Sequence, residues 1–286
     1  MLRRPYGPSK LPVSAIVFGG IVVKDLPQER ANAVVRRAFD RGVNYFDVAP
    51  TYGTPEALLG PALAELPRSE VFLACKTTKR DAAGARAELE NSLKTLQVEH
   101  LDLYQFHAVG SQADVDRILA PGGALETFVR AKERGRVRHL GFSAHDEDAG
   151  LRLLEAYPFD SALFPVNWVS LCADVFGRRL LEACKAKGVS ALALKAMARC
   201  AWSGTRDPRY PFLWYQPETD PELAALALRY TLAQGVTAAV PPGHEELFWR
   251  AVDVAERYRA PDGEELRRLE ARAEELTPLF PVPPKA

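Results

Sequence analysis

The sequence predicts an α/β fold, a single (β/α)₈ TIM barrel in which eight parallel strands close into a cylinder surrounded by helices. Eight short apolar runs alternate with longer amphipathic stretches, which is typical of a parallel sheet. These units span about 240 residues, the length that such a barrel needs. No GxGxxG loop joins an early strand to a helix, since Gly19 and Gly20 stand alone, and this disfavours a doubly wound sheet.

The individual elements follow from the spacing of apolar residues along the chain. Strands are expected at residues 15–19, 44–48, 71–76, 101–107, 137–143, 161–166, 189–195 and 237–241. Helical periodicity covers residues 28–41, 55–64, 82–97, 124–135, 146–156, 174–187 and 220–233. Several of these helices are expected to end at a glycine, as at Gly42, Gly135, Gly188 and Gly235.

The chain is expected to form one domain over residues 1–286, because no Gly- or Ser-rich linker divides it. A long loop at about 196–219 follows the seventh expected strand. The C-terminal helix and tail occupy about 262–286, with the helix at 262–275 and a loosely ordered end after it.

Composition narrows the classes of partner. Lys plus Arg and Asp plus Glu each total 37, so the net charge is zero and disfavours nucleic acid or an anionic membrane as a partner. Neither a signal peptide nor an apolar run long enough for a membrane span is recognisable in the sequence. The four cysteines show no CxxC pair and no His at ligand spacing, which predicts reduced thiols and a cytoplasmic protein.

Four residues at or just after successive strand ends predict the chemistry. Barrel enzymes carry catalytic groups at the C-terminal ends of their strands, where this chain has Asp47, Lys76 and His107, with Tyr52 in the loop after Asp47. A phenol has a pKa near 10, which a neighbouring ammonium lowers. Tyr52 would therefore protonate a carbonyl oxygen, Lys76 would tune it and Asp47 would keep Lys76 charged. His107 would orient the carbonyl.

Each of these residues has a structural alternative. Asp47 can cap a strand end, Lys76 can carry a solvated ammonium, and His107 can be a core histidine with satisfied hydrogen bonds. Their complementary placement at the ends of one predicted barrel favours the catalytic interpretation. A metal-dependent hydrolase or aldolase would need clustered His and carboxylate ligands, and only His107 and Asp47 qualify, so no metal site is expected. A Schiff-base aldolase could use Lys76, although Tyr52 and Asp47 suit hydride chemistry better.

Several segments together resemble the aldo-keto reductases. GVNYFDVAPTYG (42–53) with EALLG (56–60) is similar to the N-terminal signature of that family, whose catalytic aspartate and tyrosine correspond to Asp47 and Tyr52. ACKTT (74–78) and LDLYQFH (101–107) resemble the strands that carry the catalytic lysine and histidine. KERGRVRHLGFSAH (132–145) resembles the segment leading to the nicotinamide-binding serine. The resemblance runs from about Val13 to Gly243 and implies a barrel that binds NADP(H) and reduces small aldehydes and ketones.

The resemblance also implies a set of cofactor contacts, some of them altered in this chain. The expected set is Gly20, Ser143, Asn167, Leu194, Lys195 and Gly243. Ala144 replaces the asparagine that often follows the serine, and Pro165 stands where a glutamine is usual, so Asn167 is the expected substitute for holding the carboxamide. Leu194 takes the place of the stacking aromatic ring, and Lys195 could reach the pyrophosphate or be a rim cation.

The phosphate end of the cofactor site departs from the family pattern as well. Many relatives clamp the 2′-phosphate with Lys, Ser and Arg, where this chain has Pro242, Gly243 and Phe248. Backbone N–H groups at Gly243 and the following helix could hold a phosphate, whereas Glu245 and Glu246 would repel one if they pointed inward. NADP(H) is therefore the cofactor that the resemblance implies, and NAD(H) is not excluded.

The loop at 196–219 is rich in aromatic residues, among them Trp214 and Tyr215, which are expected to line the substrate pocket. The alternative is that these rings only pack the loop onto the barrel rim. The sequence thus predicts an oxidoreductase that interconverts a small carbonyl compound and its alcohol, with a nicotinamide cofactor. The alternative is a non-catalytic, regulatory barrel that binds nicotinamide, and a tuned phenol argues against it.

Overall fold

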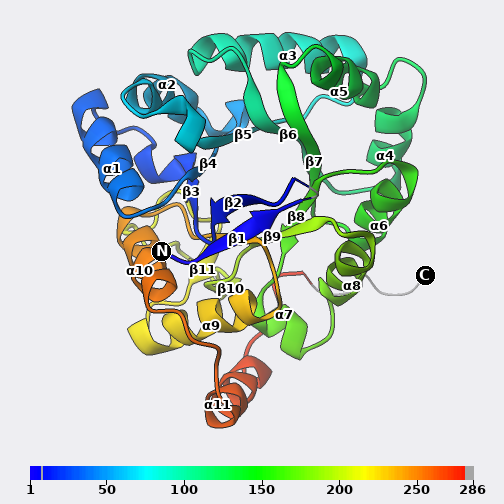
Figure 1. Cartoon of the computed structure of the whole chain (residues 1–286). Helices are drawn as coiled ribbons and strands as arrows, with labels where there is room; N and C mark the ends of the chain where they lie inside the picture. Colours follow the sequence, from blue (N-terminus) through cyan, green and yellow to red (C-terminus); the bar gives the residue numbers. More distant parts are fainter. Residues whose placement is uncertain (8, 281–286) are drawn as a thin grey trace.

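The computed structural model describes residues 1–7 and 9–280, and they contain the predicted barrel. Its eight strands form one parallel sheet surrounded by helices (Figure 1). In sheet order the strands are β3 (Val17–Gly19), β4 (Tyr45–Asp47), β5 (Phe72–Thr77), β6 (Leu101–Val109), β7 (Val137–Ala144), β8 (Ser161–Pro165), β9 (Ser190–Leu194) and β12 (Ala238–Val240). A parallel bridge between Ile16 and Ala239 brings the last strand back to the first.

The helices pack against the outside of the barrel. They are α1 (Gln28–Asp40), α2 (Pro55–Ala64), α3 (Ala82–Thr95), α4 (Gln112–Leu119), α5 (Ala124–Glu133), α6 (Glu147–Ala156), α7 (Trp168–Cys172), α8 (Arg178–Lys187), α9 (Pro221–Ala233), α10 (Glu245–Glu256) and α11 (Gly263–Glu274). Asp81, Asp146 and Asp220 cap α3, α6 and α9 by accepting a backbone N–H three residues further on. The predicted glycine stops are confirmed, and Gly188 has a φ of +67° that suits a residue without a Cβ.

The helices and the long loop differ from the prediction in three ways. First, two short helices, α4 and α7, were not predicted. Helix α8 begins at Arg178 rather than at residue 174, because Asp174 and Gly177 have positive φ values of 52° and 100° that break the helix. The predicted loop at 196–219 contains an antiparallel hairpin of β10 (Ala198–Ala201) and β11 (Tyr215–Pro217). Helix α11 lies within the predicted 262–275, and the end of the predicted tail, 281–286, lies outside the described residues.

An N-terminal hairpin, also not predicted, covers one end of the barrel. Strands β1 (Arg3–Tyr6) and β2 (Leu11–Ser14) pair antiparallel and lie across the opening that faces the viewer in Figure 1. Tyr6 is fully buried, packs against Tyr45 and Phe72, and donates a hydrogen bond of 2.9 Å from its hydroxyl to Ser161 Oγ. The hairpin therefore covers the amino ends of the strands, whereas Asp47 and Lys76 lie at or near the carboxyl ends of β4 and β5.

The alternation of side chains along the strands places polar groups at that open end. Tyr45 on β4 and Phe72 and Ala74 on β5 belong to one buried cluster inside the barrel. Because side chains on one face of a strand recur every second residue, Asp47 and Lys76 face the same interior one step closer to the carboxyl end. The register pairs Asp47 on β4 with Ala74 on β5. Lys76, two residues further along β5, therefore reaches the Asp47 carboxylate on the neighbouring strand.

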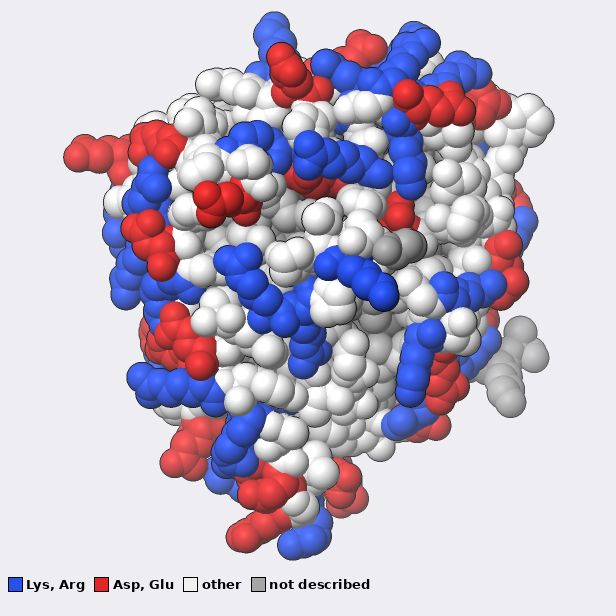
Figure 2. Space-filling model, viewed as in Figure 1, with Lys and Arg blue, Asp and Glu red and all other residues white. Residues whose placement is uncertain are grey.

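The surface shows no region dominated by one charge on the face in view. Figure 2 shows basic and acidic side chains interspersed over this face, in keeping with equal totals of 37 each. Among the residues that the structure describes, no helix is both long and apolar enough to cross a bilayer.

Candidate active site

The ammonium of Lys76 is the centre of the site. It forms an ion pair with Asp47 on the neighbouring strand, and its Nζ lies 3.3 Å from the Tyr52 hydroxyl oxygen and 3.4 Å from the carbonyl oxygen of Val48. Lys76 is 1% exposed and Asp47 is 3% exposed, so water does not screen their attraction. The structure thus brings together three of the four residues that the sequence predicts as catalytic.

A short turn after β4 aims Tyr52 at this ion pair. Residues Pro50–Tyr52 form a 3₁₀ helix, with Pro50 at its first position, where the missing N–H costs nothing. The turn ends at Gly53, whose φ of +92° is accessible mainly to glycine. The chain then enters α2 directly, so the phenol is held between the strand end and a packed helix.

Burial and charge act against each other on the pKa values of this group. Burial raises the pKa of Tyr52, and the nearby Lys76 ammonium opposes that rise without cancelling it. Burial lowers the pKa of Lys76, but the Asp47 carboxylate outweighs burial and holds the pKa above its ordinary value. Lys76 therefore stays charged, and Tyr52 carries its proton at neutral pH, next to a cation that can stabilise the phenolate.

His107 joins the site through a bulge in β6. The register between β6 and β7 shifts between Phe106 and Val109, and Ala108 has a φ of +51°. The imidazole packs edge-on against Tyr52 with 5.6 Å between ring centroids, and its Nδ1 lies 3.3 Å from Thr51 Oγ1. Burial and the nearby Lys76 cation lower the pKa of His107 to about 3, so the ring is neutral in the physiological range.

A cavity of about 210 Å³ opens beside these four side chains. Its other walls come from the carboxyl ends of several strands and from the long loop: Gly19, Ile21, Ser143, His145, Leu163, Leu194, Lys195, Phe212, Leu213, Trp214, Tyr215, Val240, Pro241 and Gly243. The predicted residues Ser143, Leu194, Lys195, Trp214 and Tyr215 therefore all line the cavity that holds Tyr52.

A family model describes this chain. The model of the aldo/keto reductase family matches residues 15–247, which include every strand of the barrel. The chain belongs to this family. The matched segment also contains Asp47, Tyr52 and Lys76.

Individual relatives are distant. L-galactose dehydrogenase of Arabidopsis thaliana is 30% identical over 169 residues, which cover 54% of this chain and 52% of that protein. An aldo-keto reductase of Bacillus subtilis is 25% identical over 221 residues, covering 71% and 63%. The chain thus spans about half to two thirds of the length of these curated relatives. An aldo-keto reductase of Bacillus halodurans has the same fold, with a TM-score of 0.74 at 23% identity over 95% of this chain and 96% of that one.

Three of the residues predicted to bind cofactor have structural tasks in this aldo-keto reductase: Asn167, Gly20 and Gly243. Asn167 is fully buried at the start of α7, donates two hydrogen bonds of 2.8 Å to the carbonyl oxygens of Lys195 and Ala198, and accepts one from the Ser170 N–H. A Cβ on Gly20 would lie 3.0 Å from a Val48 methyl group.

Gly243 lines the cavity, but a Cβ on it would lie 2.5 Å from Ile21 Cγ2, so close packing requires a glycine there. Asn167 and Gly20 lie outside the cavity lining, and their cofactor roles stay predictions.

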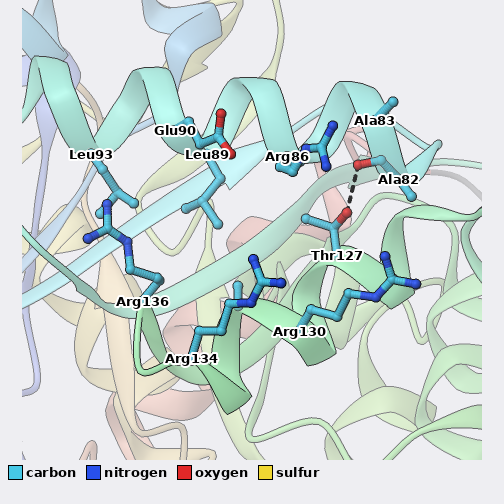
Figure 3. Close-up of a pocket in the computed structure, with 11 residues that line it drawn as sticks. Ala82, Ala83, Arg86, Leu89, Glu90, Leu93, Thr127, Arg130, Arg134 and Arg136 are labelled. Carbon is cyan, nitrogen blue, oxygen red and sulfur yellow. Dashed lines mark hydrogen bonds between the residues drawn. The ribbon is translucent and has the colours of Figure 1, made fainter.

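Other hollows of this aldo-keto reductase lie away from the chemistry. A groove of about 600 Å³ runs between α3 and α5, with Arg86 on one wall and Arg130, Arg134 and Arg136 on the other (Figure 3). It contains none of the predicted catalytic residues, and Thr127 and Ala82 join its walls through a hydrogen bond of 2.6 Å. Within residues 1–7 and 9–280, no group of three or more His, Cys, Asp or Glu residues is placed to hold a metal ion.

The sequence reasoning missed His145 among the polar residues of the cavity. It follows Ser143 by two positions on β7 and its extension, and this period of two was the available signal. Burial, together with the nearby Lys195 cation, lowers the pKa of His145 to about 4. The cavity of this aldo-keto reductase thus holds two neutral histidines and two lysines.

Proposed function

We propose that this protein is an NADP(H)-dependent oxidoreductase that reduces an aldehyde or ketone to an alcohol, or catalyses the reverse reaction, with Tyr52 as general acid/base. The observation that carries the proposal is the position of the Lys76 ammonium, which contacts both the Asp47 carboxylate and the Tyr52 hydroxyl at the wall of the cavity. Membership of the aldo/keto reductase family supports the same reaction class.

In the proposed mechanism, the side chains manage the proton. The reduced nicotinamide, when bound, supplies the hydride to the carbonyl carbon. Tyr52 donates its hydroxyl proton to the carbonyl oxygen as negative charge develops there, and the Lys76 ammonium 3.3 Å away stabilises the phenolate that remains. Asp47 keeps Lys76 charged throughout. In the oxidation direction the phenolate accepts the proton of the alcohol.

His107 orients the substrate in this scheme. A neutral imidazole has one donor nitrogen and one acceptor nitrogen. Nδ1 lies close to Thr51 Oγ1, which leaves Nε2 to hydrogen-bond the carbonyl oxygen. Because burial and Lys76 lower the pKa of His107 to about 3, this role does not depend on protonation near neutral pH.

The residues around the cavity fit the nicotinamide end of the cofactor. Leu194 and Val240 offer apolar walls for a ring, and Ser143 offers a buried hydroxyl that already accepts a hydrogen bond of 3.4 Å from the Ala108 N–H. Ser143 and Leu194 would hold the ring, and the cavity backbone at Gly243 would lie nearby. At about 210 Å³ the cavity is smaller than the roughly 300–1,000 Å³ of ordinary ligand pockets, so it would hold the nicotinamide end and not the whole dinucleotide.

The choice between NADP(H) and NAD(H) depends on the start of α10. Its first turn carries Glu245 and Glu246, and each is paired with an arginine: Glu245 with Arg30 at 2.6 Å and Glu246 with Arg250 at 2.5 Å. These partners offset the repulsion that two carboxylates would exert on a phosphate. Because the family generally uses NADP(H), NADP(H) is the cofactor to test first.

A regulatory barrel without catalysis is the less favoured alternative. A protein that only senses nicotinamide does not need to bury Lys76 and Asp47 beside a phenol, since burying ions is costly unless they are paired. The free-energy cost of burying this ion pair is explained if Tyr52 must release its proton during each turnover.

The test is Tyr52→Phe, with Tyr45→Phe as the matched control. Tyr45 is a buried tyrosine on the adjoining strand, in the apolar cluster inside the barrel. With a verified carbonyl substrate, Tyr52→Phe should lower kcat by about 10²–10⁴-fold, the usual contribution of general acid catalysis. Cofactor affinity, measured by quenching of tryptophan fluorescence, should stay unchanged in both variants. A Tyr52→Phe enzyme that keeps more than half of the wild-type kcat would contradict the proposed role of the phenol.

A further inference from the structure

A groove on the outer side of the barrel carries an excess of positive charge. It lies between α3 and α5, has a volume of about 600 Å³ and shares no lining residue with the catalytic cavity. Its charged lining consists of four arginines and one glutamate: Arg86, Glu90, Arg130, Arg134 and Arg136 (Figure 3). Positive charge therefore outweighs negative charge in the groove, although the whole chain has a net charge of zero.

Three of these four arginines have no carboxylate partner. Arg130 pairs with a glutamate one turn earlier on α5, at 3.1 Å. Arg86, Arg134 and Arg136 form no ion pair with any residue that the structure describes, and Glu90 in the same lining forms none either. All four arginines are exposed, so their guanidinium groups are accessible to a ligand from solution.

The guanidinium groups reach the groove from both of its walls. Arg86 belongs to α3, whereas Arg134 directly follows the last residue of α5, and Figure 3 shows its side chain extending towards α3. Arg130 lies on the same wall as Arg134, because residues four apart share one face of a helix. An anionic group in this part of the groove would therefore meet arginines from both walls.

The floor of the groove is apolar. Leu89, Leu93 and Ala131 line it and are at most 7% exposed. The Thr127 hydroxyl already donates its proton to the carbonyl oxygen of Ala82 at 2.6 Å. Along α3 the lining extends from Ala82 to Leu93, about 16 Å at 1.5 Å per residue. The groove is thus longer than a single anionic group, and its floor offers a hydrocarbon body a surface for packing.

Arginines on two walls favour a phosphate over a carboxylate. A carboxylate has two oxygen atoms and one charge, which a single arginine can match with its two parallel N–H groups. A phosphate monoester has three acceptor oxygen atoms and a charge of about −1.5 to −2 at pH 7. It can therefore accept hydrogen bonds from two or three arginines at once.

We propose that the groove between α3 and α5 binds a small organic phosphate monoester. The phosphate lies between Arg86 on one wall and Arg130 and Arg134 on the other, and the apolar body of the ligand extends along Leu89 and Leu93. This site is separate from the catalytic cavity, and its existence does not depend on the proposed reaction.

Calorimetric titration with hexyl phosphate tests the proposal, with inorganic phosphate and hexanoate as comparison ligands. Inorganic phosphate should bind wild type at least about 10-fold more weakly than hexyl phosphate, a difference that corresponds to the burial of about two methylene groups. Hexanoate should also bind more weakly, because it brings one charge and two oxygen atoms. The affinity for hexyl phosphate should be the same with and without saturating NADPH, because the two sites share no residue.

The variant Arg86→Gln/Arg134→Gln removes one guanidinium from each wall. It should weaken binding of hexyl phosphate by about 5- to 30-fold, the loss expected for two solvent-exposed charged contacts. Glutamine is a good helix former, and circular dichroism should show an unchanged fold.

The matched control is Arg117→Gln/Arg267→Gln. These two arginines are also exposed, lie on α4 and α11, form no ion pair within the described part of the chain and do not line the groove. The control changes the total charge by the same amount, so it should leave the affinity for hexyl phosphate unchanged.

Four results would overturn the proposal. The first is an unchanged affinity in the groove variant, and the second is an equal loss in the control, which would reflect the total charge of the protein. The third is binding of inorganic phosphate or hexanoate as tight as that of hexyl phosphate, because the apolar floor or the phosphate would then contribute nothing. The fourth is competition between NADPH and hexyl phosphate, which would place the ligand in the catalytic cavity.

Discussion

Removal of Lys76 alone should destabilise the protein more than removal of Lys76 and Asp47 together. Both side chains are at most 3% exposed, so Lys76→Met leaves the Asp47 carboxylate in the barrel interior without its cation. Breaking a buried pair in this way costs about 3–5 kcal/mol of unfolding free energy. At about 2–4 °C per kcal/mol, the melting temperature should fall by roughly 6–20 °C.

The double variant Lys76→Met/Asp47→Leu is the informative comparison. It replaces both charges by apolar side chains of similar size, an exchange that is often neutral or stabilising. Urea unfolding followed by circular dichroism should show that the double variant recovers most of the loss. The reasoning is refuted if the single variant lies within about 1 kcal/mol of wild type, a change that an ordinary surface substitution can produce. It is equally refuted if the double variant is less stable than the single one.

The other predictions concern the backbone around the cavity and the two histidines. Asn167→Ala removes two donated hydrogen bonds and a helix N-cap, and should lower the unfolding free energy by about 2–4 kcal/mol in urea titrations; a variant as stable as wild type would contradict its structural task. The folded-state pKa values of His107 and His145 are lowered from 6.5 to about 3 and about 4, so the unfolded chain takes up these protons first. Their contribution to stability is complete above about pH 7 and should decline from about pH 6.5 towards pH 3, by up to about 1.4 kcal/mol per pH unit for each histidine. Unfolding of a His107→Gln/His145→Gln variant at the same pH values should show a smaller decline, and an equal decline would assign the effect to other groups.

The strands and the contact between Asp47 and Lys76 could be predicted because each depends on local pattern. A run such as 44–48 is short, apolar and followed by a turn, and the period of two then places Asp47 inside the barrel. The order of the strands in a parallel barrel follows the order in the chain, so Asp47 and Lys76 had to be neighbours. Sequence alone was sufficient for this part of the site.

The structural task of Asn167 could not be predicted in the same way. The distance of two residues from the expected glutamine position suggested that the Asn167 amide faces a ligand. The structure instead turns it towards the carbonyl oxygens of Lys195 and Ala198, which lie about thirty residues further along the chain. Contacts of this kind depend on the path of a long loop, and no period or motif in the sequence encodes that path. The N-terminal hairpin was missed because its strands, RRPY and LPVS, are half exposed and contain no continuous apolar run.

Backbone strain around the cavity is found at or directly beside two residues that line it, His107 and Lys195. Ala108 has a φ of +51° directly after His107, and Lys195 itself has a φ of +65°. Such conformations cost on the order of 1–3 kcal/mol each, and both are held by side-chain hydrogen bonds, from Ala108 N–H to Ser143 Oγ and from Asn167 to the Lys195 carbonyl. Asp47 and Lys76, which act on the substrate only through Tyr52, lie on regular strands without strain of this kind. The regular strands therefore position the Asp47–Lys76 ion pair, whereas Tyr52 and His107 depend on irregular backbone at Gly53 and Ala108.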